Sequence, residues 1–130
     1  MYTVKEVSKM LGMTEHTIRF YTDKGLVPSL QRNQNNNRLF DEKSIHWLKG
    51  AQILRGCGMS IEVIKAYVDL CLQGDSTIRE RYEIILKQKE IVDAKLIEIT
   101  QKAESITNKA NNYEYVMNHL IPDNSNPDKW

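Results

Sequence analysis

An apolar repeat of 3.5 residues in the second half of the chain constrains its fold more than any other feature. The repeat advances in alternating steps of four and three residues, and Lys89 is its one polar member. Its positions, which we call the seam, are Ile78, Tyr82, Ile85, Lys89, Val92, Leu96, Ile99, Ala103, Ile106, Ala110, Tyr113, Met117 and Leu120. Over about six heptads, this spacing predicts a single helix of about 65 Å with a coiled-coil contact surface.

The chain is too short to cover the seam with a second core of its own. With 130 residues, of which 41% are apolar, it can bury one modest core. We therefore expect the seam to be buried on a second copy, because two-fold pairing is the commonest closed symmetry. The expected contacts in this homodimer are Ile78, Tyr82, Ile85, Val92, Leu96, Ile99, Ala103 and Ile106. The alternatives are a helix that folds back on its own domain and a polar helix that stays frayed, and the sequence leaves parallel or antiparallel pairing open.

Two short helix signals joined by a tight turn open the chain. The first helix is predicted to begin at Thr3, which has the capping-box spacing to Glu6, and to end at Gly12. Its predicted apolar face comprises Val4, Val7, Met10 and Leu11. A second helix runs from Thr14 to Lys24. Its residues expected to face the body of the domain are Ile18 and Phe20. This order predicts a helix-turn-helix whose second helix is free to enter a major groove of DNA.

A polar segment, residues 29–37, follows the second helix and carries Arg32. Asparagine tolerates left-handed backbone angles, so residues 35–37 can turn a short hairpin without glycine. Its returning strand would be Arg38, Leu39 and Phe40. The alternation of an arginine with apolar neighbours favours a wing, and the alternative is a flexible loop.

Two further helices are predicted to form the floor beneath these elements. Asp41 caps the third helix, which Gly56 and Gly58 end, and Ser60 caps the fourth. The buried residues predicted for the third helix are Ile45, Leu48, Ile53 and Leu54, with Trp47 as a further core residue. The predicted inner face of the fourth helix comprises Ile61, Ile64, Tyr67, Val68 and Leu72.

The expected fold is mainly α, with a winged helix-turn-helix domain over residues 1–73 and a coiled-coil helix over residues 76–120. Residues 121–130 are short and rich in Asn, Asp and Pro, which predicts a disordered tail. Residues 1–60 carry nine Lys and Arg against five Asp and Glu, whereas residues 61–130 carry nine against twelve. Basic side chains are thus concentrated around the helix-turn-helix, where contact with phosphates would need them.

Several function classes have no support in the sequence. No apolar run is long enough to span a bilayer and no leader precedes the first helix, so we expect a cytoplasmic protein. Cys57 and Cys71 form no disulfide framework and lack the paired spacing of zinc ligands, so we expect no metal and no other cofactor. No nucleophile with its base and no phosphate-binding glycine loop occurs at a usable spacing, so we expect no enzyme.

Four motifs together resemble those of the MerR family of bacterial transcriptional regulators, over residues 1 to about 115. They are TEHTIRFY at residues 14–21, KGLVP at 24–28, NNRLF at 36–40 and GMSI at 58–61. The resemblance implies a winged helix-turn-helix and a dimer through an antiparallel coiled coil. It also implies binding to an inverted repeat in a promoter whose two recognition elements are spaced too far apart for RNA polymerase to read both. It also implies that bending and untwisting this DNA lets RNA polymerase read both elements. Such a deformation costs on the order of 1–10 kcal/mol.

The resemblance also assigns roles to residues of the second helix and the wing. In the family, the position of His16 reaches base edges. The positions that support it by base or phosphate contacts are Thr14, Thr17, Arg19 and Tyr21. Arg32 and Arg38 are expected to contact phosphates or the minor groove, assisted by Asn35 and Asn36. The alternatives are a surface histidine without a role at position 16 and an ion pair between Arg19 and Asp23.

The most similar subgroup responds to aldehyde and thiol-reactive stress through a cysteine in the third helix, five residues before the Gly-Met-Ser turn. Here Ile53 occupies that position, and Cys57 lies directly before Gly58. Cys57 is therefore a hypothetical thiol sensor, with a small buried apolar residue as the alternative; for Cys71 we prefer that alternative. The sequence identifies no small inducer.

Two other classes of function fit part of the sequence. A DNA-bending architectural or excision-type factor without effector response shares the small winged fold, but such factors usually lack a long dimer helix. A coiled-coil adaptor that binds protein would not need a basic first half. The preferred interpretation is a dimeric, sequence-specific transcriptional regulator.

Overall fold

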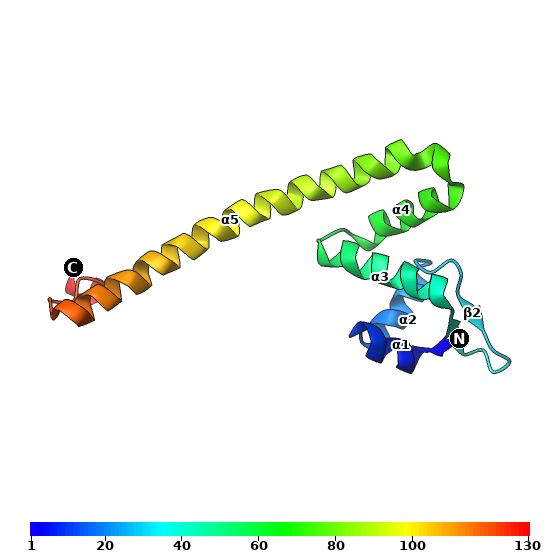
Figure 1. Ribbon diagram of the computed structural model, residues 1–130, viewed down its shortest axis with the longest axis horizontal. Helices are drawn as coiled ribbons and strands as arrows, with labels where there is room; N and C mark the ends of the chain where they lie inside the picture. Colours follow the sequence, from blue (N-terminus) through cyan, green and yellow to red (C-terminus); the bar gives the residue numbers. More distant parts are fainter. The chain divides into compact units, whose positions relative to one another are not determined.

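The computed structural model describes residues 1–130 and consists mainly of helices with one small sheet (Figure 1). The elements are β1 (Tyr2–Thr3), α1 (Val4–Leu11), α2 (Glu15–Asp23), β2 (Gln31–Arg32), β3 (Arg38–Phe40), α3 (Glu42–Gly56), α4 (Ile61–Gln73), the 3-10 helix η1 (Asp75–Thr77), α5 (Ile78–His119) and the 3-10 helix η2 (Pro127–Lys129). The predicted fold class, mainly α with a winged helix-turn-helix and a long C-terminal helix, is confirmed. None of the helices combines the length and the apolar character that crossing a bilayer requires.

The chain forms two compact units, Met1–Lys89 and Glu90–Trp130. The boundary that the sequence placed between residues 73 and 76 therefore lies within α5. The reason is that the first turns of α5 pack on the first unit. Ile84 contacts its apolar core, and Gln88 Nε2 donates a hydrogen bond of 2.6 Å to the carbonyl oxygen of Cys57.

Side-chain caps start four helices at the predicted residues. Each of these caps accepts a hydrogen bond from the backbone N–H three residues ahead, and they are Thr3, Thr14, Asp41 and Ser60. The N–H of Thr3 also donates to Glu6 Oε1 at 3.1 Å, which completes the capping box. Gly12 and Gly25 end α1 and α2 with φ angles of 64° and 78°, a conformation that glycine adopts without steric cost.

Two of the carboxylates that bind these backbone N–H groups have a lowered pKa. The hydrogen bond from the backbone N–H of Thr3 is the main cause for Glu6. For Asp41 the main cause is the backbone N–H of Ser44, which lies 2.8 Å from Oδ1. Both hydrogen bonds favour the ionised carboxylate over the protonated form. The first turns of α1 and α3 are therefore held more firmly above these pKa values than below them.

A three-stranded antiparallel sheet joins the N-terminus to the wing. Its strand order is β1-β3-β2. The paired residues are Tyr2 with Phe40, Thr3 with Leu39, Gln31 with Leu39, and Arg32 with Arg38. The hairpin of β2 and β3 was predicted, but β1 was not, because a strand of two residues, the second of which is the helix cap Thr3, shows no strand periodicity. β1 fixes the start of α1 beside the wing.

The apolar core of the first unit is built from helices α1 to α4, the segments that follow α1, α2 and α3, and strand β3. Its largest fully buried apolar side chains are Phe40, Ile18, Leu26, Leu48, Met59, Ile64 and Val7. Trp47 is half-buried against this core, in agreement with its predicted role. The helix-turn-helix and the wing therefore share one hydrophobic core with α3 and α4.

Four apolar residues predicted to face this core are exposed instead: Met10, Phe20, Ile53 and Leu72. Ile53 lies about 200° around α3 from the buried Ala51, and Phe20 lies about 200° around α2 from Ile18, so both point away from the core. Met10 lies at the edge of the narrow buried strip of α1, and Leu72 lies at the end of α4 beyond the core. Short helices on a small core thus bury fewer positions than their apolar pattern predicts.

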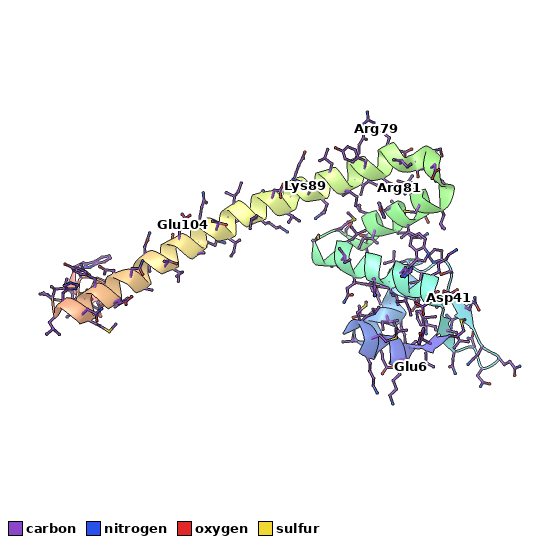
Figure 2. All side chains as sticks on the ribbon, in the orientation of Figure 1. Glu6, Asp41, Arg79, Arg81, Lys89 and Glu104 are labelled. Atoms are coloured by element: carbon purple, nitrogen blue, oxygen red, sulfur yellow. The ribbon has the colours of Figure 1, made fainter.

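Thr77 ties the end of α4 to the start of α5. Its side chain is 2% exposed, and Oγ1 lies 2.7 Å from the carbonyl oxygen of Leu70 and 2.8 Å from that of Gly74. Arg81 Nε donates to Thr77 Oγ1 at 3.0 Å, and its guanidinium also reaches the carbonyl of Gly74 and, at 3.9 Å, Cys71 Sγ. Figure 2 shows Arg81 on the side of α5 that faces α4. These polar contacts fix the turn between the two helices.

The seam lies almost entirely within one continuous helix. Large seam side chains are strongly exposed on the single chain, with exposed fractions of 60% for Leu96, 58% for Ile99 and 66% for Ile106. Leu120 does not belong to the helix, because α5 ends at His119 and Leu120 has a left-handed φ of 49°. The helix predicted over residues 76–120 is therefore slightly shorter at both ends.

The tail after α5, for which the composition predicted disorder, makes local contacts in the structure. Asn126 caps the short helix η2, which begins with Pro127. Asn112 Nδ2 on α5 donates to Asn124 Oδ1 at 2.8 Å, and Trp130 Nε1 donates to the carbonyl oxygen of Asn124 at 3.1 Å. Composition favoured disorder, but side-chain hydrogen bonds to α5 and a proline at the helix start supply the order.

Candidate nucleic-acid interface

The second helix of the helix-turn-helix, α2, presents polar side chains near its start. The side chain of His16 is exposed and makes no hydrogen bond to another side chain. Arg19 Nη2 lies 3.3 Å from Glu15 Oε1, so Arg19 pairs with Glu15 rather than with Asp23, the partner considered as an alternative. The reason is that the carboxylate of Asp23 already binds Arg38. His16 and Arg19 thus both lie on the solvent side of α2.

The other residues predicted on α2 have structural tasks. Thr14 Oγ1 accepts the backbone N–H of Thr17 at 3.0 Å and donates to the Thr17 hydroxyl at 2.8 Å, which fixes the start of the helix. Tyr21 is 6% exposed and belongs to the apolar core. Little of its surface is therefore available to a nucleic acid, whereas Thr14 is exposed.

The tip of the wing is organised by Asn33, a residue that the sequence analysis did not single out. Its Oδ1 accepts the backbone N–H groups of Asn35 at 2.9 Å and Asn37 at 3.0 Å. Asn36 takes the left-handed conformation with φ 61°. An asparagine that binds the backbone two residues ahead is a known turn signal, so this role was readable from the run of asparagines. The exposed Asn35 and Asn36 lie at the outer end of the hairpin.

The two wing arginines have different surroundings. Arg32 is exposed, and its Nη1 donates to the carbonyl oxygen of Asn36 at 3.0 Å. Arg38 has a side chain only 18% exposed, with Nε 2.9 Å from Thr22 Oγ1 and Nη2 2.7 Å from Asp23 Oδ1. Arg38 therefore ties the wing to the end of α2, while Arg32 keeps a guanidinium in solvent.

A surface hollow of about 270 Å³ brings the start of α1, α2 and the wing together. Its lining residues are Thr3, Val4, Lys5, Glu15, Arg19, Asn33, Asn36, Asn37, Arg38 and Leu39. Lys5, which the sequence analysis did not select, joins Arg19 and Arg38 there. Backbone and cationic groups on three elements can thus face one extended polyanion such as a DNA strand.

Both cysteines are free thiols of intermediate burial. Cys57 is half-buried at the C-terminal cap of α3, and Cys71 is half-buried near Arg81 and Tyr67. The pKa of Tyr67 is raised, mainly by burial and further by the nearby Cys71. No three His, Cys, Asp or Glu side chains converge in a way that would hold a metal ion.

The helix-turn-helix, wing and following helices agree with the family that the sequence motifs resembled. The family model described as MerR HTH family regulatory protein matches residues 2–71. The chain belongs to the MerR family. The predicted resemblance is thereby confirmed, and so is the coarse function of a DNA-binding transcriptional regulator.

Two relatives described as HTH-type transcriptional regulators resemble the chain beyond residue 71. An uncharacterized HTH-type transcriptional regulator of Haemophilus influenzae is 31% identical over 113 residues, which cover 87% of this chain and 84% of that protein. The HTH-type transcriptional regulator AdhR of Bacillus subtilis is 32% identical over 87 residues, 67% of this chain and 62% of AdhR.

Solved MerR structures show the same fold. HiNmlR, a MerR family regulator lacking the sensor domain and bound to promoter DNA, matches with a TM-score of 0.77 and 30% identity, over 89% of this chain and 92% of HiNmlR. A MerR family regulator from Bacillus thuringiensis matches with a TM-score of 0.75 and 34% identity, over 86% of this chain and 98% of that one.

Proposed function

We propose that two copies of this MerR family chain pair along the seam and bind an inverted repeat in a promoter. The observation that carries the proposal is the exposure of large seam residues, including Leu96, Ile99 and Ile106, at regular 3.5-residue spacing along one helix. Exposed apolar side chains in one continuous stripe mark a protein contact surface. The remaining seam contacts are Ile78, Tyr82, Ile85, Val92 and Ala103.

The proposed pairing is antiparallel, as in the family that the chain resembles. Such a dimer carries one DNA-binding unit near each end of the paired helices and has two-fold symmetry. A two-fold symmetric protein requires a two-fold symmetric site, so each unit reads one half of an inverted repeat. The spacing of the half-sites then follows from the dimer.

On each half-site, α2 lies in the major groove and the wing lies along the backbone. His16 reads base edges, and Arg19, Thr14 and Thr17 support it at the same groove. Arg32, assisted by Asn35 and Asn36, contacts phosphates or the minor groove beside the recognition site. Arg38 and Tyr21 act by holding β3 and α2 in place, since their side chains are largely covered.

Regulation by this dimer acts through the shape of the promoter. Bending and untwisting the spacer between two recognition elements costs on the order of 1–10 kcal/mol, which phosphate contacts from both units offset. RNA polymerase then reads both elements of the reshaped promoter. Cys57 remains the candidate for reception of a thiol-reactive signal, and an unchanged response to electrophiles in Cys57→Ser would exclude it.

Selection of duplexes from a random pool by the full chain tests the proposed site. We expect an inverted repeat with one fixed half-site spacing. A single unpaired half-site, or no enrichment, contradicts the proposal. An architectural bending factor predicts instead bent duplexes with weak sequence preference, so a bending assay on the recovered sequences separates the two functions.

A further inference from the structure

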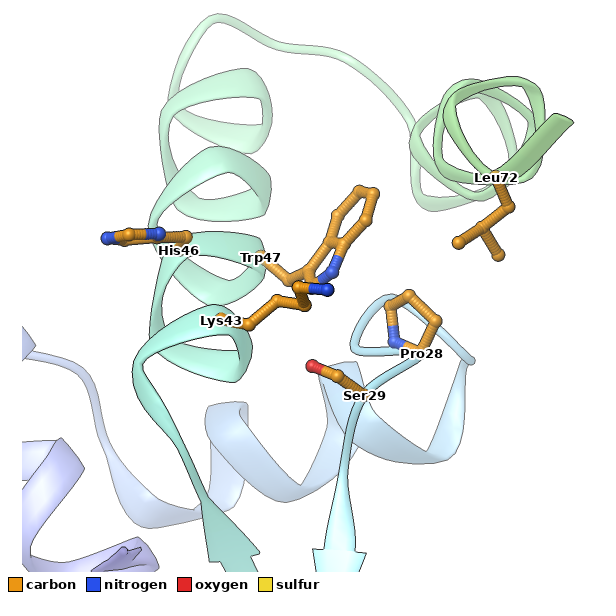
Figure 3. Close-up of a pocket in the computed structure, with 6 residues that line it drawn as sticks. All are labelled: Pro28, Ser29, Lys43, His46, Trp47 and Leu72. Carbon is orange, nitrogen blue, oxygen red and sulfur yellow. The ribbon is translucent and has the colours of Figure 1, made fainter. Parts of the chain in front are cut away.

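We propose that the first unit contains a binding site for a flat aromatic anion, in a hollow between α3, the end of α4 and the loop that enters the wing. The hollow has a volume of about 450 Å³ and is lined by Pro28, Ser29, Lys43, His46, Trp47 and Leu72 (Figure 3). This size lies within the range of small-molecule sites. All six residues belong to the first unit, so the site does not depend on the dimer.

The walls of the hollow suit a flat apolar guest. Figure 3 shows the indole of Trp47 across an open space from Leu72 and Pro28. Leu72 is 59% exposed although it continues the apolar face of α4, so its side chain has no apolar cover in the free chain. Aromatic rings stack favourably on one another and on aliphatic side chains. A ring inserted between Trp47 and Leu72 would cover both.

One positive charge at the mouth of the hollow selects an anion. Figure 3 shows the side chain of Lys43 alongside the indole of Trp47, and Lys43 forms no ion pair within 4 Å, although its charge contributes to the lowered pKa of Asp41. None of the lining residues is acidic. The carboxylate of the neighbouring Asp41 binds the backbone N–H of Ser44, and the Ser29 hydroxyl bonds to that of Ser44. A carboxylate on the aromatic guest would therefore meet an available ammonium group.

The position of the hollow couples a guest to the DNA-binding elements, a step that rests on the proposed function. Ser29 lies two residues before β2 of the wing, and Leu72 lies two residues before Gly74 at the turn into α5. A guest that contacts both residues joins the base of the wing to the start of the long helix. Its binding free energy would thus shift the affinity for an operator.

A titration of the full chain with 2-naphthoate, followed by the two indole N–H signals in NMR spectra, tests the site. We expect the Trp47 signal to shift to a plateau and the Trp130 signal, which belongs to the second unit, to stay unchanged. Lys43→Gln should raise the dissociation constant for 2-naphthoate about fivefold, because one exposed charge pair contributes about 1 kcal/mol. 2-Naphthol is neutral at pH 7, so the natural chain should bind it more weakly than 2-naphthoate by a similar factor. Lys49→Gln removes an exposed charge from the same helix outside the hollow and should have no effect.

An unshifted Trp47 signal, equal drifts of both indole signals without a plateau, or equal binding by the Lys43→Gln variant would overturn the site. Leu72→Trp should fill the hollow and abolish the shift, while circular dichroism confirms that the variant is folded. The titration needs neither DNA nor pairing, so its result is independent of the proposed function. If 2-naphthoate binds but leaves operator affinity unchanged, the coupling to the wing is wrong.

Discussion

The guanidinium of Arg38 lies 2.7 Å from the carboxylate of Asp23, so strand β3 of the wing and the end of α2 are joined by an ion pair. The same side chain donates to the hydroxyl of Thr22. Arg32, in contrast, donates to one backbone oxygen and stays in solvent. The two arginines of the wing are therefore expected to serve DNA binding in different ways.

A double-mutant cycle separates these roles. Arg38→Ala should weaken binding to all duplexes because it releases the wing from α2 and leaves Asp23 unpaired beside the DNA, and adding Asp23→Asn should restore only the part due to the unpaired charge. Arg32→Ala should lower the slope of log K against log salt by about 1, and Asp23→Asn should not restore that loss. Binding isotherms at several salt concentrations measure both effects. An Arg38→Ala variant whose salt slope also falls by about 1 would instead place Arg38 on a phosphate.

His16 should determine how strongly the protein discriminates between operator sequences. His16→Ala removes an exposed side chain of α2 that makes no hydrogen bond to another residue, so the fold should be unaffected while discrimination falls by about 1–3 kcal/mol per operator. Competition between the selected operator and single-base variants measures this loss. His119→Ala, an exposed histidine at the end of α5, is the matched control. Equal discrimination by His16→Ala and the natural chain would remove His16 from the base contacts.

Asp41 should make stability depend on acid pH. Its pKa is lowered below the ordinary 3.8 by the N–H of Ser44, so the carboxylate stabilises the fold fully above pH 3.8. This contribution is lost as the pH falls through the lower pKa of the folded state. Asp41→Asn can still cap α3 without a charge, so its thermal midpoint should fall less steeply between pH 4 and pH 2. Parallel curves for both proteins would contradict the assignment.

Thr77 should be the most sensitive polar residue of the turn between α4 and α5. Thr77→Val keeps the shape but leaves Arg81 Nε and the two carbonyl oxygens without the hydroxyl, which should cost about 1–3 kcal/mol in urea unfolding. Thr77→Ser keeps the hydroxyl and should retain most of the stability. A Val variant as stable as the Ser variant would show that the hydroxyl contributes little.

Local signals in the sequence predicted elements well, whereas partners between elements could not be predicted. The caps at Thr3, Thr14, Asp41 and Ser60 depend on residues only three positions apart, and all four were predicted correctly. The partner of Asp23 could not be predicted from spacing, because Arg38 reaches Asp23 from another element. A contact across 15 residues leaves no periodic trace in the sequence.

The same limit explains what was missed at the candidate interface and in the core. Lys5 joins the hollow beside the wing only because β1 pairs with β3. Ile53 and Phe20 are apolar, but their angular positions on short helices, rather than their type, decide that they stay exposed. The sequence pattern therefore predicted the helices and strands of the candidate interface, whereas tertiary packing decides which of their side chains are exposed to a nucleic acid.

A substitution in the seam should separate pairing from folding of the first unit. Leu96→Lys places a charge in the middle of the proposed contact and should shift the protein to single chains, because a buried unpaired charge is strongly unfavourable. Operator affinity should fall with it, while the helical content stays. Tyr115→Ala removes an exposed aromatic side chain of α5 that lies outside the seam and should leave the mass unchanged.

Sedimentation equilibrium of the full natural chain tests the central claim most directly. We predict a species of twice the chain mass of 15.1 kDa, at concentrations where the protein binds its operator. A single species of 15.1 kDa under those conditions would contradict the account.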